Sequence, residues 1–334
     1  MKSIKVGVIG LGVGEKHISG YRNHPDCEVV ALCDFSDEKL AMAKSRYPGI
    51  RLTLKPDDLL QDPDIEAVSI ASYDNYHYQQ IVRAIENDKH IFIEKPLCLY
   101  ASEAVHIRQL LQQKPGLKIS SNLILRLSPR FLELKQMITD GDLGQLFYVE
   151  GDYNYGRLHK ITEGWRGKID FYSVVYGGAV HLVDLLLWLT GDRVVEVAAY
   201  GNTLASRGTD FRYNDIVVSI LKFESGLIGK VVSNFGCVAP HFHSLSIYGT
   251  KATFVNGPEY ATLLESRDPA QKGTKITTPY PGVEKGDLIY SFVESILDRS
   301  PAGVTAEDIF KTMSVCFAIE KATHQSDSVM VRYI

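Results

Sequence analysis

The sequence predicts an α/β fold in which a parallel, doubly wound sheet comes first and an antiparallel sheet follows. Strands alternate with helices over the first 121 residues, which is typical of a parallel sheet. A glycine-rich turn follows the first strand. From Leu146 onward strands dominate, with turns suited to hairpins, which is typical of antiparallel pairing. The 334 residues suffice for two domains, and we expect these to be 1–123 and 124–334.

The first elements predict a dinucleotide site. A strand of β-branched residues at 4–9 leads into the glycine turn and then a helix that extends to about His24. Glycines in such a turn let the backbone approach a pyrophosphate, which sits at the helix N-terminus. A second strand, 28–33, ends in Asp34, near the spacing of a ribose-binding carboxylate. The turn consists of Gly10, Leu11, Gly12, Val13 and Gly14, and it is one residue shorter than the usual G-x-G-x-x-G.

Asp34 also bears on the choice of coenzyme. A carboxylate at this position accepts hydrogen bonds from the ribose 2′-hydroxyl and repels a 2′-phosphate. No arginine stands directly beside it in Phe35-Ser36-Asp37. The residue therefore favours NAD over NADP, although it could instead only cap the helix that follows.

The alternation continues with further strands and helices. We expect helices at 39–47, 78–87 and 102–113, and strands at 65–71, 91–93 and 118–121. The turn after Ala71 contains Ser72, Tyr73, Asn75 and His77. Because parallel strands bind ligands outside their carboxyl ends, we expect this turn to face the same coenzyme.

Glu94-Lys95-Pro96 ends the next strand. A lysine at this end of a parallel strand is placed to act on a ligand. The Lys95–Pro96 bond can be cis at modest cost, which would fix the direction of Lys95. The simpler alternative is an exposed Glu–Lys pair, which contributes little. We expect Lys95 to be catalytic, and Glu94 to hold either Lys95 or the nicotinamide end of the coenzyme.

The second half of the sequence is predicted to form mainly strands, with a few helices that cover them. Expected strands are 146–153, 194–200, 216–223, 227–234, 243–248 and 252–255, and expected helices are 130–139, 291–297 and 306–323. Glu224-Ser225-Gly226 suits a hairpin turn. The polar stretch 266–278 is expected to be a mobile surface loop.

An apolar helix is expected at 179–189. Its only ionisable groups, His181 and Asp184, are three residues apart and share a face. Burying both is costly unless they find partners. Either they satisfy each other, or they line a polar cavity. The stretch is too short to span a bilayer.

Composition excludes several classes of protein. The formal net charge of −4 and the pI near 6.2 give no basic excess that would attract nucleic acid. The five cysteines are scattered and form no C-x-x-C pair, which argues against a disulfide framework or a zinc site and fits a reducing cytosol. The chain starts directly with a strand, without a signal-peptide pattern. We expect a cytoplasmic protein with no membrane partner.

Taken in order, these motifs resemble the glucose-fructose oxidoreductase / inositol dehydrogenase / MocA family, and the resemblance covers essentially the whole chain. The later motifs that carry it are Asn122 to Pro129, Gly141-Asp142-Leu143-Gly144, Gly164-Trp165-Arg166-Gly167, Gly178 to Asp184 and Ile247-Tyr248-Gly249-Thr250. The resemblance implies an N-terminal Rossmann domain that binds a nicotinamide coenzyme. It also implies a C-terminal α/β domain with a large open, mostly antiparallel sheet whose open face commonly packs against another subunit. We therefore expect a homodimer or homotetramer acting on a sugar, cyclitol or activated sugar.

The resemblance also implies roles for individual residues. It places a histidine at the position of His181 in the active site. We expect Lys95 to hydrogen-bond the reacting oxygen, His181 to act as general base or acid, and Asp184 to orient or balance the imidazole. Candidates for substrate binding are Arg126, Tyr153, Trp165, Arg166 and Tyr176, followed by Tyr155, His241 and His243. Trp165 could instead be a core residue.

One departure leaves alternatives open. Many dehydrogenases of this family have an aspartate four residues before the histidine, where this chain has Gly177. Tyr172 or Tyr176 could supply a hydroxyl in its place. The alternatives are a catalytically inactive dinucleotide-binding regulator, a non-redox net reaction with recycled NAD, and a nucleotide-sugar keto-reductase of polysaccharide biosynthesis. We expect no metal site, because His241 and His243 have no identifiable partner ligand.

Overall fold

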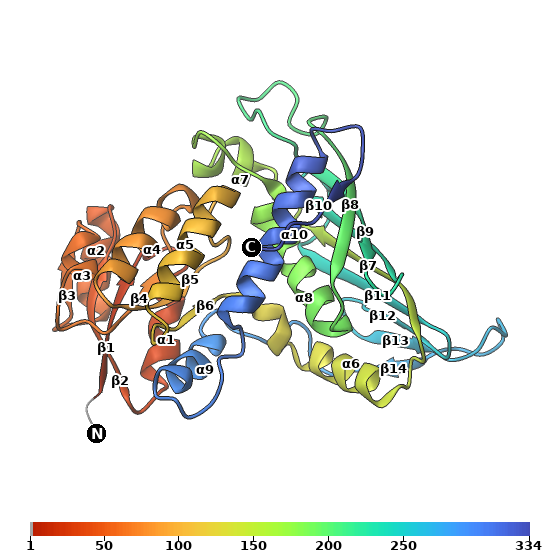
Figure 1. Ribbon diagram of the computed structural model, residues 1–334, viewed down its shortest axis with the longest axis horizontal. Helices are drawn as coiled ribbons and strands as arrows, with labels where there is room; N and C mark the ends of the chain where they lie inside the picture. The colour runs from red at the N-terminus through yellow and green to blue at the C-terminus, as the bar shows by residue number, and fades with distance from the viewer. Residues whose placement is uncertain (1–2) are drawn as a thin grey trace. The chain divides into compact units, whose positions relative to one another are not determined.

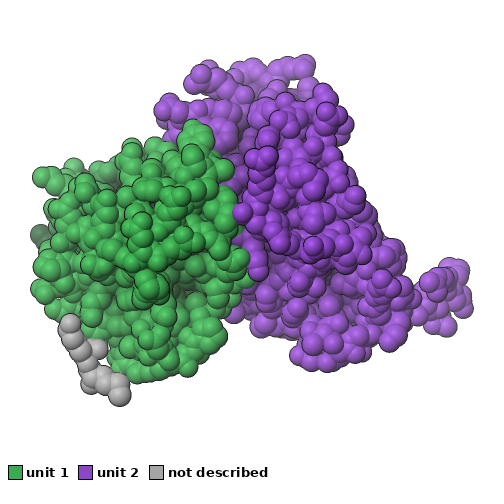
Figure 2. All heavy atoms as spheres, viewed as in Figure 1, with its two compact units in different colours: residues 1–124, 284–310, 334 green, residues 125–283, 311–333 purple. Residues whose placement is uncertain are grey.

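The structure is a computed structural model, in which residues 3–334 are described and form two compact units (Figure 2). The first unit contains the chain up to residue 124 together with residues 284–310 and 334. The second contains residues 125–283 and 311–333. Residues 284–310 thus join the first unit, which the expected division between residues 123 and 124 did not include. The physical reason is close packing: a Cβ on Gly286 would lie 3.0 Å from the backbone of Gly20.

The first unit is built on a parallel sheet in the order β3-β2-β1-β4-β5-β6 (Figure 1). Its strands are β1 (Ile4–Ile9), β2 (Cys27–Cys33), β3 (Arg51–Thr53), β4 (Ala67–Ile70), β5 (His90–Ile93) and β6 (Ile119–Ser121). Its helices are α1 (Glu15–Arg22), α2 (Asp37–Arg46), α3 (Asp57–Leu60), α4 (His77–Glu86), α5 (Ala101–Gln113) and α9 (Asp287–Ile296). The predicted parallel sheet is confirmed; β3 and α3 were not predicted. Strand order reverses between β1 and β4, where such sheets bind ligands.

Local sequence explains where these helices begin. The hydroxyl of Ser36 accepts a hydrogen bond from the Lys39 N–H and caps α2. The Glu103 carboxylate in the first turn of α5 accepts hydrogen bonds from the N–H groups of Leu99 and Tyr100. These caps fix where each helix starts after its strand.

The second unit contains a sheet of nine strands in the order β14-β13-β12-β11-β7-β10-β9-β8-β15. The strands are β7 (Leu146–Asn154), β8 (Val194–Asn202), β9 (Ile216–Phe223), β10 (Ile228–Asn234), β11 (Phe242–Gly249), β12 (Thr253–Val255), β13 (Ala261–Leu264), β14 (Thr274–Ile276) and β15 (Val329–Met330). All neighbours pair antiparallel except β7 and β10, which are parallel. The hairpin between β9 and β10 turns at Gly226, whose φ of 91° suits glycine. The expected loop at 266–278 is wrong in part, because β14 lies within it and pairs with β13.

Helices accompany one face of this sheet. Figure 1 shows α6 (Pro129–Asp140), α8 (Val180–Thr190) and α10 (Ala306–Ala322) along the same face. Among the described residues 3–334, no helix covers the other face. Shorter turns are η2 (Ile124–Leu127), α7 (His159–Thr162), η3 (Trp165–Gly167) and the π-helix η4 (Val175–Ala179). Within the described part of the chain, no helix is long and apolar enough to cross a bilayer.

Candidate active site

The glycine turn after β1 has the geometry of a pyrophosphate cradle. A Cβ on Gly10, whose φ is 88°, would clash with the carbonyl of Ala71. A Cβ on Gly14 would clash with the carbonyl of Gly10, so this glycine allows α1 to start close to the strand. Gly12 is exposed, and a Cβ there would lie 3.8 Å from the Lys39 ammonium. Tight turn, open approach and close packing are the roles of the three glycines in a dinucleotide turn, so the shorter spacing keeps them all.

Asp34 ends β2 beside this turn, and its buried carboxylate is held from three directions. Oδ2 accepts the Leu11 N–H at 2.7 Å, and Oδ1 accepts the Ser36 N–H at 2.9 Å. The ammonium of Lys39, on α2, lies 3.2 Å from Oδ2. The predicted acid is therefore fixed against the glycine turn. Sequence reasoning missed Lys39, whose position five residues after Asp34 was the available signal.

The turn after β4 lies at the same sheet edge. Three of its predicted residues are at least partly exposed, and the fourth is buried. The Ser72 hydroxyl donates to Gln80 at 2.7 Å, Asn75 is exposed, and the Tyr73 ring lies edge-on to Phe35 with centroids 5.3 Å apart. His77 is buried, with its ring nitrogens facing the carbonyl oxygens of Pro96 (2.7 Å) and Ser72 (3.2 Å). His77 thus links the loop after β4 to the loop after β5 and has a structural role.

Lys95 follows β5, and its bond to Pro96 is cis. The preceding carboxylate, of Glu94, points into a buried network. Its Oε1 lies 3.2 Å from Nε2 of His17 and accepts a hydrogen bond from Asn122 at 2.7 Å. His17 in turn contacts the Ser69 hydroxyl at 2.8 Å.

The charge of Glu94 is stabilised within this network. Burial raises the pKa of the Glu94 carboxyl, but Lys285, His17 and Lys95 outweigh burial and hold the pKa well below its usual value. Asn122 also donates to the carbonyl of Lys285 at 3.0 Å. Sequence reasoning missed His17, Asn122 and Lys285, because they are far apart in sequence and meet only when the sheet forms. The network ties α1, β4, β5 and the segment before α9 together around Glu94, the residue that precedes Lys95.

In the second unit, His181 and Asp184 are both buried on α8, as the sequence predicted. Asp184 forms a bidentate ion pair with Arg126, with Nε to Oδ2 at 2.8 Å and Nη2 to Oδ1 at 2.6 Å. The Thr312 hydroxyl adds a third hydrogen bond, at 3.1 Å. Arg126 was predicted to bind substrate, but its guanidinium is used here to balance a buried carboxylate.

His181 lies among aromatic side chains from β7 and β11. Its ring is nearly parallel to that of Tyr153 with centroids 6.2 Å apart, and the His243 ring is also 6.2 Å away. Tyr153 and His243 are direct partners in the sheet, and Nδ1 of His243 lies 2.6 Å from the Tyr280 hydroxyl. Burial raises the pKa of the Tyr153 phenol, which keeps it neutral. Three predicted residues therefore meet here, with Tyr280 as a partner that the sequence did not reveal.

The turn before α8 contains Gly177 and Gly178 in crowded surroundings. Residues Val175–Ala179 form a π-helix, a feature that often marks functional sites. A Cβ on Gly178 would meet the Tyr153 ring at 2.5 Å, and a Cβ on Gly177 would clash with the Tyr172 hydroxyl. Tyr172, and not Tyr176, therefore fills the space in front of residue 177. Tyr176 is buried with ring contacts to Phe171 and Phe317.

Trp165 and Arg166 lie on η3. The Arg166 guanidinium is 4.6 Å from the Trp165 ring centroid and 6.0 Å from that of Tyr172. Trp165 meets Tyr172 edge-on at 6.3 Å. Arg166 is thus held by stacking, which orients a guanidinium as bidentate recognition requires.

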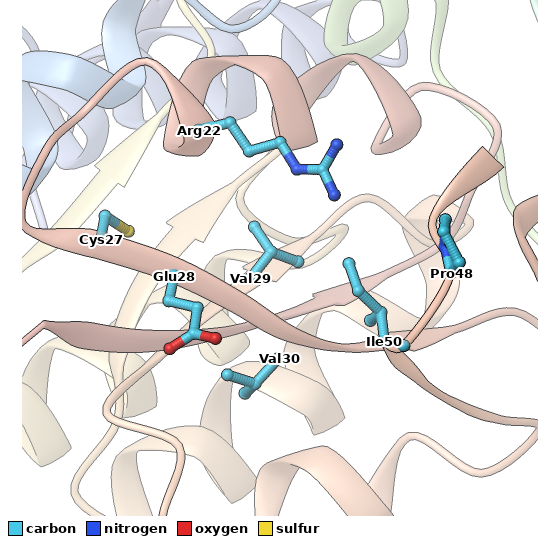
Figure 3. Close-up of a pocket in the computed structure, with 8 residues that line it drawn as sticks. Arg22, Cys27, Glu28, Val29, Val30, Pro48 and Ile50 are labelled. Carbon is cyan, nitrogen blue, oxygen red and sulfur yellow. The ribbon is translucent and has the colours of Figure 1, made fainter.

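Two other features of the structure do not belong to this chemistry. No group of three or more metal-ligating side chains occurs in residues 3–334. A pocket of about 430 Å³ lies at the start of β2 and includes Arg22, Cys27, Val29 and Ile50 (Figure 3). It lies at the amino ends of the strands, opposite the ligand-binding edge of a parallel sheet.

Two family descriptions match the chain, one after the other along the sequence. A family described as "Oxidoreductase family, NAD-binding Rossmann fold" matches residues 4–121, and the "GFO/IDH/MocA C-terminal domain" matches residues 131–255. The chain is 22% identical to myo-inositol 2-dehydrogenase of Thermotoga maritima over 348 residues, covering 99% of each chain.

Solved structures show the same fold over the full length. Levoglucosan dehydrogenase in complex with NADH is 20% identical, with a TM-score of 0.88 and 100% coverage of both chains. Scyllo-inositol dehydrogenase from Lactobacillus casei, with bound NAD(H) and scyllo-inositol, is 23% identical, with a TM-score of 0.80 and 99% coverage of both chains. With both family descriptions matched in order, the chain belongs to the GFO/IDH/MocA family of NAD-binding oxidoreductases.

Proposed function

We propose that this protein is an NAD(H)-dependent dehydrogenase or reductase of a secondary alcohol or ketone on a sugar, a cyclitol or an activated sugar. One observation carries the proposal. The glycine turn, the Ser72 turn and Lys95 follow β1, β4 and β5, which are neighbours in the parallel sheet. A lysine therefore stands at the same sheet edge as the dinucleotide turn. The relatives named for inositol and levoglucosan support the substrate class.

We assign roles to the side chains as follows. Bound nicotinamide supplies the acceptor or donor of hydride. Lys95 donates a hydrogen bond to the reacting oxygen. His181 takes the hydroxyl proton in oxidation and returns it in reduction. Asp184 pairs with Arg126, accepts a hydrogen bond from Thr312 and lies one helical turn from the imidazole.

Substrate recognition is proposed to involve Tyr153, Arg166 and the Tyr172 hydroxyl. The resemblance to the family leads us to expect an aspartate at residue 177, where this chain has Gly177 with the Tyr172 hydroxyl in front of it. With a phenol near this position and no carboxylate at it, we expect the preferred polyol to differ from that of inositol-type relatives. Stacked Arg166 provides a site for a carboxylate or phosphate on the substrate.

The first test is an absorbance screen for NADH formation from NAD with inositols, anhydrosugars and hexoses. We expect turnover with at least one polyol. Lys95→Met should then lower kcat about a hundredfold or more while leaving NADH affinity nearly unchanged. Lys55→Met, at an exposed lysine, is the matched control. Tight NADH binding without turnover of any polyol or keto sugar would contradict the proposal and favour a regulator.

We also propose a homodimer or homotetramer and a cytoplasmic location. The uncovered sheet face bears exposed Tyr200, Val218, Ile220 and Ile228, and contiguous exposed apolar side chains mark association surfaces. All five cysteines of the chain are free thiols, which fits a reducing compartment.

A further inference from the structure

We propose that the dinucleotide site accepts NADP(H) as well as NAD(H), and that Lys39 is the residue that sets its tolerance of a 2′-phosphate. This inference rests on the dinucleotide site alone and does not depend on which substrate is oxidised. It concerns the edge formed by Gly12, Asp34 and Lys39. Asp34 by itself predicts rejection of the phosphate, so the position of the lysine is decisive.

The first observation is that Asp34 is not an isolated negative charge. Its side chain is only 1% exposed, and the Lys39 ammonium lies 3.2 Å from Oδ2. The repulsion that Asp34 would exert on a phosphate is therefore offset by a cation in direct contact. The pair differs from an ordinary surface ion pair, because the carboxylate is buried and also held by two backbone N–H groups.

The second observation is that Lys39 reaches the part of the turn left open for a ligand. Within residues 3–334, and apart from the chain neighbours of Gly12, its Nζ is the one atom within 4 Å of where a Cβ on exposed Gly12 would lie, at 3.8 Å. The Lys39 side chain is 38% exposed and also lies against Phe35, with Nζ 5.6 Å from the ring centroid. The ammonium thus borders both the glycine approach and the acid at the ribose position.

The number of donors and acceptors at the Asp34–Lys39 pair is compatible with either coenzyme. An ionised carboxylate offers about four acceptor positions, and three donors occupy Asp34. One position remains for the 2′-hydroxyl of NAD(H). An ammonium has three donors, of which Asp34 takes one. Lys39 can keep Asp34 and still donate to a 2′-phosphate, which carries nearly two negative charges at neutral pH.

The experiment is titration calorimetry of NADH and NADPH against the wild type, Lys39→Gln and Lys44→Gln. Lys44 is an exposed lysine on the same helix and serves as the matched control for loss of one charge. We expect wild-type Kd values for the two coenzymes within about tenfold of each other. Lys39→Gln should weaken NADPH about tenfold or more and NADH much less, because hydrogen bonds to charged groups are strong. Lys44→Gln should preserve the ratio.

Three results would overturn the proposal. The first is a wild type that binds NADH but not NADPH. The second is equal weakening of both coenzymes by Lys39→Gln, which would place the lysine on their shared pyrophosphate. The third is a Lys39→Gln variant in which neither affinity changes. A chain that binds neither coenzyme would contradict the dinucleotide site itself, and a chain that binds both but oxidises no polyol would contradict only the proposed substrate class.

Discussion

Gly177 is a residue whose identity is set by its neighbour. It lies in the π-helix before His181, where a side chain would clash with the Tyr172 hydroxyl. An aspartate therefore cannot be restored at this position while Tyr172 keeps its place. The two residues therefore constrain each other.

This coupling predicts a non-additive pair of substitutions. Gly177→Ala should lower the free energy of unfolding by about 1–3 kcal/mol, because the added methyl overpacks the site. In a Tyr172→Ala background the same change should cost much less, giving a coupling of about 1 kcal/mol or more. Urea unfolding of the four proteins measures it. Gly116→Ala is the control, because a Cβ at Gly116 has no neighbour within 4 Å. Additive costs would contradict the clash.

Asp184 and Arg126 form a second coupled pair, and both are buried. Asp184→Asn leaves the guanidinium uncompensated and should reduce the free energy of unfolding by about 3–5 kcal/mol. The double variant Arg126→Met with Asp184→Leu removes both charges and should recover much of that loss. Urea titration is again the measurement. A loss below about 1 kcal/mol in Asp184→Asn would show that the pair is not desolvated as the structure has it.

Glu94 predicts a dependence of stability on pH. Its pKa in the folded protein is held well below 4.5, chiefly by Lys285 and His17 against the opposing effect of burial. A carboxyl with a depressed folded pKa stabilises the fold above its unfolded pKa, and that contribution is lost as pH falls through the folded value. The free energy of unfolding should therefore fall from about pH 4.5 downward.

Glu94→Gln isolates this contribution. The variant should be less stable at neutral pH and should show a shallower fall in stability on acidification. Denaturant titrations across this range provide the comparison. Glu38→Gln, at an exposed glutamate, should retain the wild-type slope, and an unchanged slope in Glu94→Gln would contradict the assignment.

At the scale of elements, α6 begins with a buried arginine that fastens a distant segment. Arg130 donates to the carbonyl oxygens of Thr278 (2.9 Å), Gly257 (2.6 Å) and Glu259 (3.0 Å), and to Oδ1 of Asn256 (2.9 Å). The same segment carries Tyr280, whose hydroxyl contacts His243 beside Tyr153. The start of α6 thus helps to position the aromatic cluster around His181.

Removing this anchor should loosen a whole segment. Arg130→Met leaves four acceptors without their donor and should cost about 3 kcal/mol or more. Limited proteolysis should then show cleavage within residues 256–283 before global unfolding. The exposed Arg207→Met is the matched control, and protection equal to wild type would contradict the anchoring role.

An element could be predicted from the sequence where a pattern of neighbouring residues determines it. It could not where it depends on pairing with a distant segment. The β-branched strand at 4–9, the glycine turn and the Ser36 cap are local patterns, and they gave the first unit's strands and helices closely. The short strands β13 and β14 form by pairing with each other, and β13 also pairs with β12. The parallel contact between β7 and β10 joins residues about 80 apart in sequence, and no local pattern encodes it.

The residues of the candidate site also fall into two groups, those that could be predicted from the sequence and those that could not. Residues at strand ends, such as Asp34 and Lys95, could be predicted because topology places the carboxyl ends of parallel strands at one edge. Their partners could not. Lys39 reaches Asp34 through its rotamer, and Arg126 meets Asp184 across 58 positions of sequence. Such contacts depend on side-chain packing, which the spacing of motifs does not determine.

At the scale of the molecule, the nine-stranded sheet has one face along helices and one without any in the described residues. The open face combines apolar Val218, Ile220 and Ile228 with ion pairs such as Lys230 to Glu150 at 2.9 Å. Apolar patches with paired charges at their edges are typical of interfaces between copies of one chain, where a twofold axis brings the same patch together.

Ile220→Glu should therefore dissociate the assembly. It places a charge among the exposed apolar residues of this face, where burial against a second copy would cost several kcal/mol. Sedimentation velocity should show a dimer or tetramer for the wild type and a smaller species for the variant. NADH affinity should persist, because the coenzyme turn belongs to the first unit and Ile220 to the second. Val238→Glu, at an exposed apolar residue outside the strands, should leave the assembly intact. A wild-type monomer, or equal dissociation by both variants, would show that the open face serves another purpose.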